Sequence, residues 1–171
     1  MKPLKNETIR TASLPSKIAP LFIAANHKGI FMFSFQRFKE GIRAVQKKYP
    51  NLKIQIDDYS LQKKLKQIVH CLKQKQRPPT PRYDLVGTPF QKKVWRALLK
   101  IPFGKTKSYS EVAQSIGRAR ASRAVGTACA KNRIALLVPC HRVICSDGRL
   151  GNYAYGMSLK KRLLDLEQVK N

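Results

Sequence analysis

A polar, proline-rich segment near the middle of the chain places the strongest constraint on how this sequence can fold. Residues 73–81 contain no large apolar side chain and three prolines, which fit neither a helix interior nor a central strand. The pattern before them mixes strand-like and helical stretches, whereas the pattern after them is helical. We therefore expect an N-terminal domain over residues 1–82, ending in a linker at about 73–82, and a C-terminal domain over residues 83–171. A long surface loop inside a single domain is the alternative.

The N-terminal part reads as a small α/β unit with a short antiparallel sheet. Two apolar runs within residues 20–35 flank Asn26-His27-Lys28-Gly29, as in a β-hairpin. A helix is expected over residues 36–48, before Pro50, and a short strand over Leu52–Ile56. A second helix follows, and its apolar face consists of Leu61, Leu65, Ile68, Val69 and Leu72.

The C-terminal part reads as mainly helical, which makes the whole chain α+β. Thr88-Pro89-Phe90-Gln91 and Ser108-Tyr109-Ser110-Glu111 are capping boxes that each open a helix, and Gly117 should close the second. A third helix fits residues 121–131. Its inward face would hold Ala121, Ala124, Val125 and Ala128, and its outer face Arg120, Arg123, Thr127 and Lys131. The helix that opens at Ser108 and the helix over residues 121–131 together predict a helix-turn-helix, although many such helix pairs do not bind DNA.

The charge of the chain favours a polyanionic partner. Lys and Arg number 35 against nine Asp and Glu, a net charge of +26 that both halves share. Such a field attracts DNA or RNA, while simple solubility is the alternative. Residues 1–7 lack an apolar signal core and no apolar run could span a bilayer, so we expect a cytoplasmic protein without a membrane partner. The four cysteines form no CxxC pair, which favours reduced thiols and no metal site.

The segment Val138-Pro139-Cys140-His141-Arg142-Val143 carries the clearest chemical signal. Cysteine is a nucleophile as the thiolate, which a nearby base, a cation or a helix N-terminus favours. Pro139 should place Cys140 at the start of a helical turn, beside a base and a positive charge. His141 would reach Cys140 only around a turn or through a water. A buried structural cysteine beside a surface histidine is the alternative interpretation.

The C-terminal helix offers a partner for that histidine. With Ser158 as its cap, the helix would carry Leu159, Leu163 and Glu167 on one apolar stripe, with Leu166 beside it. A carboxylate on such a stripe needs a partner, and His141 is a suitable one because a carboxylate orients a catalytic imidazole. A partly exposed carboxylate at a frayed helix end is the alternative.

Ordered motifs from about Gly87 to Glu167 resemble those of the O6-alkylguanine–DNA alkyltransferases, also called methylated-DNA–protein-cysteine methyltransferases. They are Gly87–Gln91 with Val94-Trp95, Ile101–Gly104 with Ser108-Tyr109, Arg123–Gly126, Asn132 eight residues before Cys140, Pro139–Val143, Gly151–Tyr153 and Leu163–Glu167. Residues 1–82 carry no such motif and are merely compatible with the family's N-terminal domain.

The resemblance implies direct repair of alkylated double-stranded DNA without a cofactor. The alkyl group, mainly methyl, would pass from O6-alkylguanine, and also from O4-alkylthymine, to Cys140. The resulting thioether is irreversible, so each molecule would act once and end inactive. We expect a cytoplasmic monomer associated with the nucleoid.

The resemblance also implies roles for individual side chains of the catalytic group. Cys140 would be the alkyl acceptor, His141 the base acting through a water, and Glu167 the group that orients it. Asn132 would hold the turn that carries Cys140. Tyr109 would hydrogen-bond the flipped guanine and help neutralise it as it leaves.

Further residues would bind the base and the DNA. The carbonyls of Cys140 and Val143 would read the exocyclic amine of guanine, the Ala154 N–H could face its oxygen, and Tyr153 and Cys129 would line the pocket. Arg123 would enter the base stack from a helix docked in the minor groove, with small or polar neighbours at Ser122, Ala124, Gly126 and Thr127.

Two departures from the family pattern and three rival functions remain open. Ala154-Tyr155 stands where some members have serine followed by glycine, which removes a hydroxyl and puts a bulky ring at the pocket rim. Residues 1–82 show no zinc ligands of the metal-bearing members. The rivals are a non-catalytic alkyltransferase-like protein, against which Cys140 argues, a regulator related to the adaptive-response protein, and a plain nucleic-acid-binding module.

Overall fold

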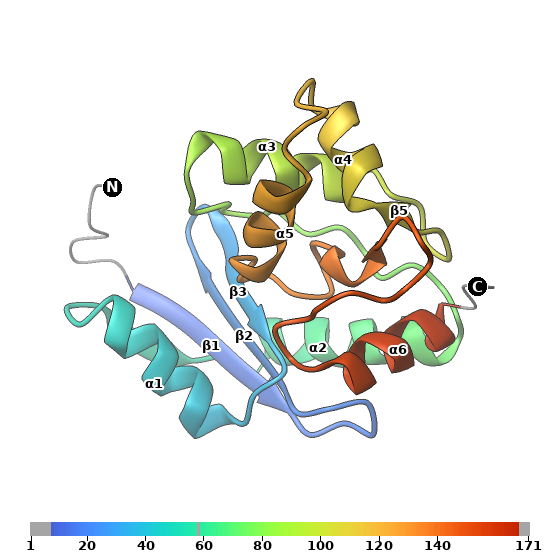
Figure 1. Cartoon of the computed structure of the whole chain (residues 1–171). Helices are drawn as coiled ribbons and strands as arrows, with labels where there is room; N and C mark the ends of the chain where they lie inside the picture. The colour runs from blue at the N-terminus through green and yellow to red at the C-terminus, as the bar shows by residue number, and fades with distance from the viewer. Residues whose placement is uncertain (1–7, 58, 168–171) are drawn as a thin grey trace.

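A four-stranded sheet with one helix against each face supports a mainly helical half, which contains the turn that carries Cys140 (Figure 1). The computed structural model describes residues 8–57 and 59–167. The opening segment, residues 1–7, lies outside that part, so the expectation about a signal core concerns residues that are not described. Among the described residues, no helix has both the length and the apolarity needed to cross a bilayer. The α+β fold class is confirmed.

The sheet is mixed rather than purely antiparallel. Its strands are β1 (Thr8–Leu14), β2 (Leu21–Asn26), β3 (Gly29–Ser34) and β4 (Lys53–Ile56), in the order β3-β2-β1-β4. The predicted hairpin is confirmed as β2–β3, and β1, which sequence reasoning did not identify, pairs with β2 antiparallel. β4 pairs with β1 in parallel because helix α1 (Phe38–Lys48) forms the crossover that brings the chain back in the same direction.

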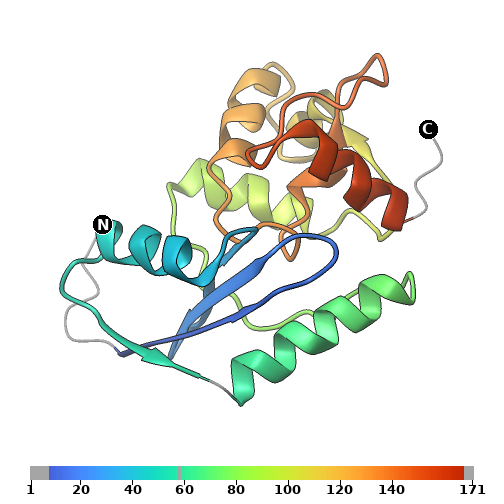
Figure 2. The same ribbon diagram turned by 90° about the horizontal axis from the view of Figure 1, so that it is seen from below.

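The two faces of the sheet are covered by different parts of the chain. Helix α1 packs on one face, where Gly41 lies so close to the Phe22 ring that a Cβ there would stand 2.3 Å from it. Helix α2 (Ser60–Lys73) packs on the other face, together with residues of the C-terminal half (Figure 2). Alternate residues of β2 enter the two clusters, since successive side chains of a strand point to opposite faces.

The C-terminal half is built from short helices whose starts the sequence predicted well. They are α3 (Pro89–Leu98), α4 (Tyr109–Ser115), α5 (Ser122–Ala130), the one-turn 3-10 helix η1 (Cys140–Arg142) and α6 (Met157–Leu166). Both capping boxes are present at Thr88 and Ser108, and Gly117 follows the end of α4 with φ 68°. A short parallel pair, β5 (Lys107–Ser108) with β6 (Val143–Ile144), ties the start of α4 to the turn that carries Cys140.

Helix α5 buries a narrower face than the sequence suggested. Val125 and Ala128 are buried as expected, but Ala124 is exposed and Ala121 is half-buried, so the inward assignment of these two alanines was wrong. The helix packs mainly against α3 and α4. The predicted outer residues are all exposed: Arg120, Arg123, Thr127 and Lys131.

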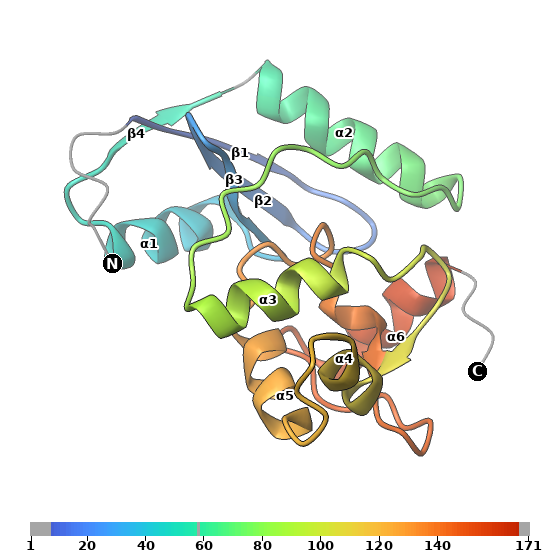
Figure 3. The same ribbon diagram turned by 90° about the horizontal axis from the view of Figure 1, so that it is seen from above.

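The proline-rich segment crosses the molecule between α2 and α3 (Figure 3). Beyond it, the chain hydrogen-bonds to the outer strand: the Ile30 N–H donates to the Arg82 carbonyl and the Asp84 N–H donates to the Ile30 carbonyl, both at 2.9 Å. Further along the same edge, the Phe33 N–H donates to the Arg133 carbonyl at 2.8 Å. One buried cluster contains residues of both halves. A division into two domains near residue 82 stays a prediction.

Candidate active site

Cys140 lies in a buried turn that Asn132 holds in place. The thiol residue is 6% exposed and opens η1, with Pro139 at the N-cap. The Asn132 Nδ2 group donates to the Val138 carbonyl at 2.8 Å and to Cys140 Sγ at 3.1 Å, while its Oδ1 accepts from the Ile134 N–H at 3.0 Å. One side chain thus fixes the backbone before the cysteine and contacts the sulfur itself.

The surroundings of the thiol oppose and assist its ionisation at the same time. Burial raises the pKa of Cys140, because the thiolate loses solvation. The Asn132 hydrogen bond, the Lys160 ammonium and the backbone N–H groups of Cys140 and His141 act in the opposite direction and lower that pKa. A thiol with a raised pKa needs a base to take its proton at neutral pH.

His141 is placed to serve as that base. Its Nε2 lies 2.8 Å from Oε1 of Glu167, and both side chains are buried. Burial lowers the pKa of His141, so the imidazole is neutral at pH 7. With Nε2 bound to Glu167, the remaining nitrogen is Nδ1, which is buried and makes no hydrogen bond to the described residues. The pairing of His141 with Glu167 expected from the sequence is therefore present.

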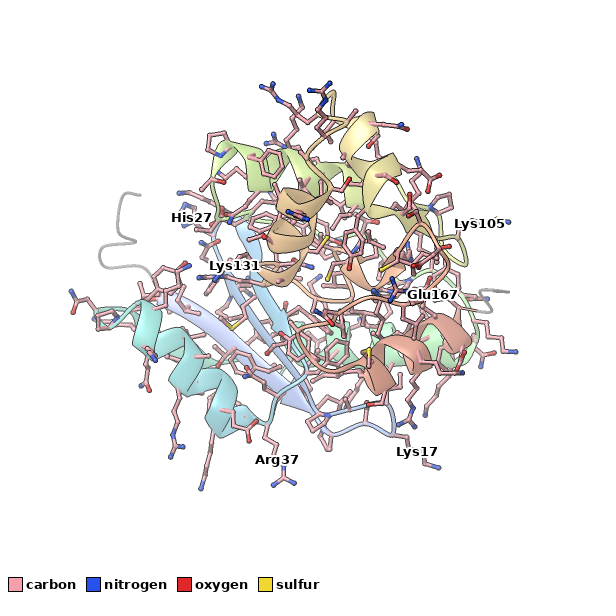
Figure 4. All side chains as sticks on the ribbon, viewed as in Figure 1. Lys17, His27, Arg37, Lys105, Lys131 and Glu167 are labelled. Carbon is pink, nitrogen blue, oxygen red and sulfur yellow. The ribbon has the colours of Figure 1, made fainter. Side chains whose placement is uncertain are left out.

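Glu167 has a second partner that sequence reasoning missed. Arg142 Nε lies 2.8 Å from Oε2 and its Nη2 donates to Oε1 at 3.0 Å, while the Gly104 N–H donates to Oε2 at 3.1 Å. Burial raises the pKa of Glu167, but the hydrogen bonds and charges of His141 and Arg142 outweigh it and lower that pKa to about 2. The carboxylate lies inside the molecule, whereas Lys17, Arg37 and Lys105 extend outward (Figure 4). A signal for this pair was present in the sequence. A carboxylate expected to be buried, such as Glu167, needs a cation as a partner, and Arg142 is the cation next to His141.

The buried face of α6 differs from the predicted stripe. Ser158 does not cap this helix, whose N-cap is Gly156 at φ 90°. Leu159 and Leu166 are only half-buried, and the buried positions are Lys160, Leu163, Leu164 and Glu167. These follow the i, i+3, i+4, i+7 spacing of one helical face, with a lysine where an apolar residue was expected.

An open cleft of about 870 Å³ leads from the surface to the Cys140 thiol. One wall comes from α5, the other from residues 145–157. Of the site residues predicted from the sequence, those that line it are Tyr109, Ser122, Arg123, Gly126, Thr127, Cys129, Cys140, Tyr153 and Ala154. Ala124 is exposed outside the cleft and Val143 is buried beneath it, as are Asn132, His141 and Glu167. Arg149 and Met157 also line it and were not anticipated.

Two tyrosines of the cleft stay protonated at neutral pH. Burial raises the pKa of Tyr109 to about 12 and that of Tyr153 further above its usual value, so both hydroxyls can donate. The Tyr155 ring packs 5.2 Å from the Phe35 ring and 5.7 Å from that of Tyr153, centroid to centroid. Tyr155 therefore packs against Phe35 and against Tyr153, which lines the cleft, while its position at the rim stays a prediction.

The nucleophile that the site offers is a cysteine thiol. All four cysteines are free, and the described residues include no cluster of three His, Cys, Asp or Glu side chains able to hold a metal ion. A buried thiol beside a neutral imidazole, at the end of a cleft lined by basic and aromatic residues, suits nucleophilic attack on a flat, electrophilic ligand.

Comparisons with known proteins agree with these features. The family model described as the 6-O-methylguanine DNA methyltransferase, DNA binding domain, matches residues 89–169. A methylated-DNA–protein-cysteine methyltransferase of Methanosarcina barkeri is 40% identical over 159 residues, covering 91% of this chain and 94% of the relative. The bifunctional transcriptional activator/DNA repair enzyme Ada of Escherichia coli is 40% identical over 126 residues, covering 74% of this chain and 36% of Ada. The solved structure of Mycobacterium tuberculosis OGT in complex with DNA superposes with a TM-score of 0.78 at 32% identity, covering 93% of each chain.

Proposed function

The chain belongs to the 6-O-methylguanine DNA methyltransferase family and repairs alkylated DNA by direct transfer of the alkyl group to a cysteine, and we propose that this cysteine is Cys140. The observation that carries the proposal is the chain of contacts behind the thiol. Asn132 bonds Cys140 Sγ at 3.1 Å, and His141 follows in the same turn, bound to Glu167 at 2.8 Å. Cys71 also has a histidine beside it in the chain, His70, but His141 beside Cys140 is the one that the structure pairs with a buried carboxylate.

The reaction is a displacement at the alkyl carbon. The thiol proton passes through a water molecule to Nδ1 of His141, and Glu167 stabilises the imidazolium that forms. The Cys140 sulfur attacks the carbon, the S–C bond forms, and the bond between carbon and the guanine O6 breaks. The electron pair goes to O6, and the Tyr109 hydroxyl hydrogen-bonds the departing guanine and offsets its charge. The thioether product cannot be reversed by thiol exchange, so each molecule acts once.

The roles proposed for the cleft follow from its walls. The damaged base must leave the stack, since O6 is inaccessible inside a duplex. We assign α4 and α5 as a helix-turn-helix, with Arg123 of the exposed face filling the space that the base vacates. Tyr153, Cys129 and the Ala154 N–H contact the base, and the Val143 carbonyl reads its amine. Ser122, Ala124, Gly126 and Thr127 allow the close approach of the DNA backbone.

The remaining features of the proposal concern scope and assembly. The substrates are O6-alkylguanine, mainly methyl, and also O4-alkylthymine, in double-stranded DNA. The protein acts as a cytoplasmic monomer at the nucleoid and needs no cofactor. Cys140 argues against a purely damage-binding role, and residues 8–57 and 59–82 contain Cys71 as their one cysteine, too few for a metal-bound cysteine domain.

Intact-mass spectrometry after incubation with duplex DNA that contains O6-methylguanine tests the proposal. We expect one added methyl group per protein molecule and no turnover when substrate is in excess. Peptide mapping should place the methyl on Cys140, and Cys140→Ser should take up none. A methyl group found on Cys129 or Cys145, or several repaired bases per molecule, would contradict the assignment.

A further inference from the structure

Helix α6 contributes a buried ammonium group that the proposed reaction leaves without a role. Lys160 is fully buried, and its Nζ donates to the Val143 carbonyl at 2.6 Å and to the Leu150 carbonyl. No carboxylate of the described residues pairs with it, in contrast to Arg142. An ammonium buried without a counter-charge costs stability, so structural support alone is a poor explanation for it.

The two carbonyls that Lys160 holds belong to opposite sides of the acceptor site. Val143 begins β6, three residues after Cys140 in the same turn, and its carbonyl is the one proposed to read the guanine amine. Leu150 lies in the segment that forms one wall of the cleft. A single side chain from α6 therefore fastens the acceptor turn to the wall of the cleft, and it sets the direction of the Val143 carbonyl.

The ammonium also lies among groups that ionise during the reaction or could do so. Its Nζ is 6.0 Å from the centroid of the Tyr109 ring. The thiols of Cys129, Cys140 and Cys145 raise the pKa of Lys160, whereas its burial lowers it. Reciprocally, Lys160 lowers the pKa of the Cys140 thiol. The other ionisable or charged groups around that thiol are His141, the Arg142–Glu167 pair, Tyr153 and Tyr155.

We propose that Lys160 is a positioning residue for alkyl transfer, because its ammonium favours the Cys140 thiolate while its hydrogen bonds hold the Val143 and Leu150 carbonyls around the base. The inference rests on the proposed function of Cys140. Of the cations around the thiol, Arg142 is neutralised by Glu167, so Lys160 is the described cation near Cys140 whose charge no carboxylate cancels.

The rate of carbamidomethylation of Cys140 by iodoacetamide, followed against pH by peptide mass spectrometry, tests the charge without DNA. One pKa unit corresponds to a tenfold change in thiolate below the pKa, and we expect Lys160→Met to slow Cys140 about tenfold at neutral pH. The rate should recover at alkaline pH. Lys160→Gln keeps a donor but removes the charge, and it should slow the reaction similarly. The matched control is Lys161→Met on the exposed side of α6, which should leave the profile unchanged.

Single-turnover methyl transfer from duplex DNA then tests positioning. We expect Lys160→Met to lose more in this assay than with iodoacetamide, since it also releases the two carbonyls, and Lys160→Gln to lose less than Lys160→Met. If either variant gives the iodoacetamide profile of the unaltered protein, the proposal is overturned. If circular dichroism shows that Lys160→Met does not fold, Lys160→Gln alone tests the proposal. An unaltered protein that takes up no methyl group at Cys140 would instead refute the proposed function, because the iodoacetamide profile does not depend on it.

Discussion

Replacing Glu167 by glutamine should weaken the fold and the reaction together. The carboxylate accepts from Arg142, from the Gly104 N–H and bonds to the His141 ring. A glutamine offers one acceptor oxygen in place of two and turns an N–H group toward donors. Breaking a buried ion pair typically costs about 3–5 kcal/mol. The lowered pKa of Glu167, about 2 in place of 4.5, gives a similar figure of about 3 kcal/mol.

The pH dependence has a definite sign. A carboxyl whose pKa is lower in the folded state stabilises the fold fully above its unfolded pKa, and this contribution disappears as pH falls through the folded value. The difference between the unaltered protein and Glu167→Gln should therefore be full at pH 7 and shrink below about pH 4.5. Urea unfolding at several pH values measures it.

The control for this prediction lies two residues before Glu167, in the last turn of α6. Asp165 pairs with Lys161 at 2.9 Å, but both side chains are more than half exposed. Asp165→Asn should therefore change the unfolding free energy by no more than about 0.5 kcal/mol. Single-turnover methyl transfer should slow in Glu167→Gln, with partial recovery at higher pH, and stay unchanged in Asp165→Asn. A loss for Glu167→Gln as small as that of Asp165→Asn would refute the argument.

Three further predictions follow from the cleft. Asn132→Leu should slow methyl transfer about tenfold or more in single-turnover assays, because it removes the contact with Cys140 Sγ. An unchanged rate would show that the turn carrying Cys140 keeps its geometry without Asn132. Arg123→Ala should slow repair of duplex DNA but barely affect reaction with free O6-methylguanine, and equal losses on both would assign Arg123 to pocket structure. Its matched control is Arg120→Ala, an exposed arginine just before α5. Tyr109→Phe should lower the rate on both substrates while DNA affinity, measured by fluorescence anisotropy, stays the same.

The local elements and the acceptor group could be read from sequence because each depends on near neighbours. Thr88 and Ser108 mark the starts of helices, because each forms a capping box with the residue three positions later in the chain. Cys140 and His141 are adjacent in the chain. The parallel β1–β4 pair could not be predicted, since it depends on where α1 returns the chain. The role of Arg142 was missed because the carboxylate of Glu167 was assigned to a single partner, His141, whereas in the structure it binds both adjacent side chains of the turn.

The buried lysine was missed for a different reason. A hydrophobic pattern is read from the apolar residues, so the expected stripe of α6 contained Leu159 and did not include Lys160, which is the buried position. The groups that accept its hydrogen bonds are the backbone carbonyls of Val143 and Leu150, and a pattern of side chains does not show which backbone carbonyls face α6. Only the packing of α6 against the acceptor turn reveals that the ammonium is enclosed.

The backbone bonds that the C-terminal half makes along β3 have a consequence for truncation. An uncovered strand edge presents free N–H and C=O groups to any other chain, a recognised route to aggregation. In the intact protein, the C-terminal half covers this edge, because the Asp84 N–H donates to the Ile30 carbonyl and the Arg133 carbonyl accepts from the Phe33 N–H. An N-terminal fragment produced alone would expose that edge as a template for self-association. We therefore expect the N-terminal half to stay soluble when the C-terminal half is attached and to aggregate when it is produced alone.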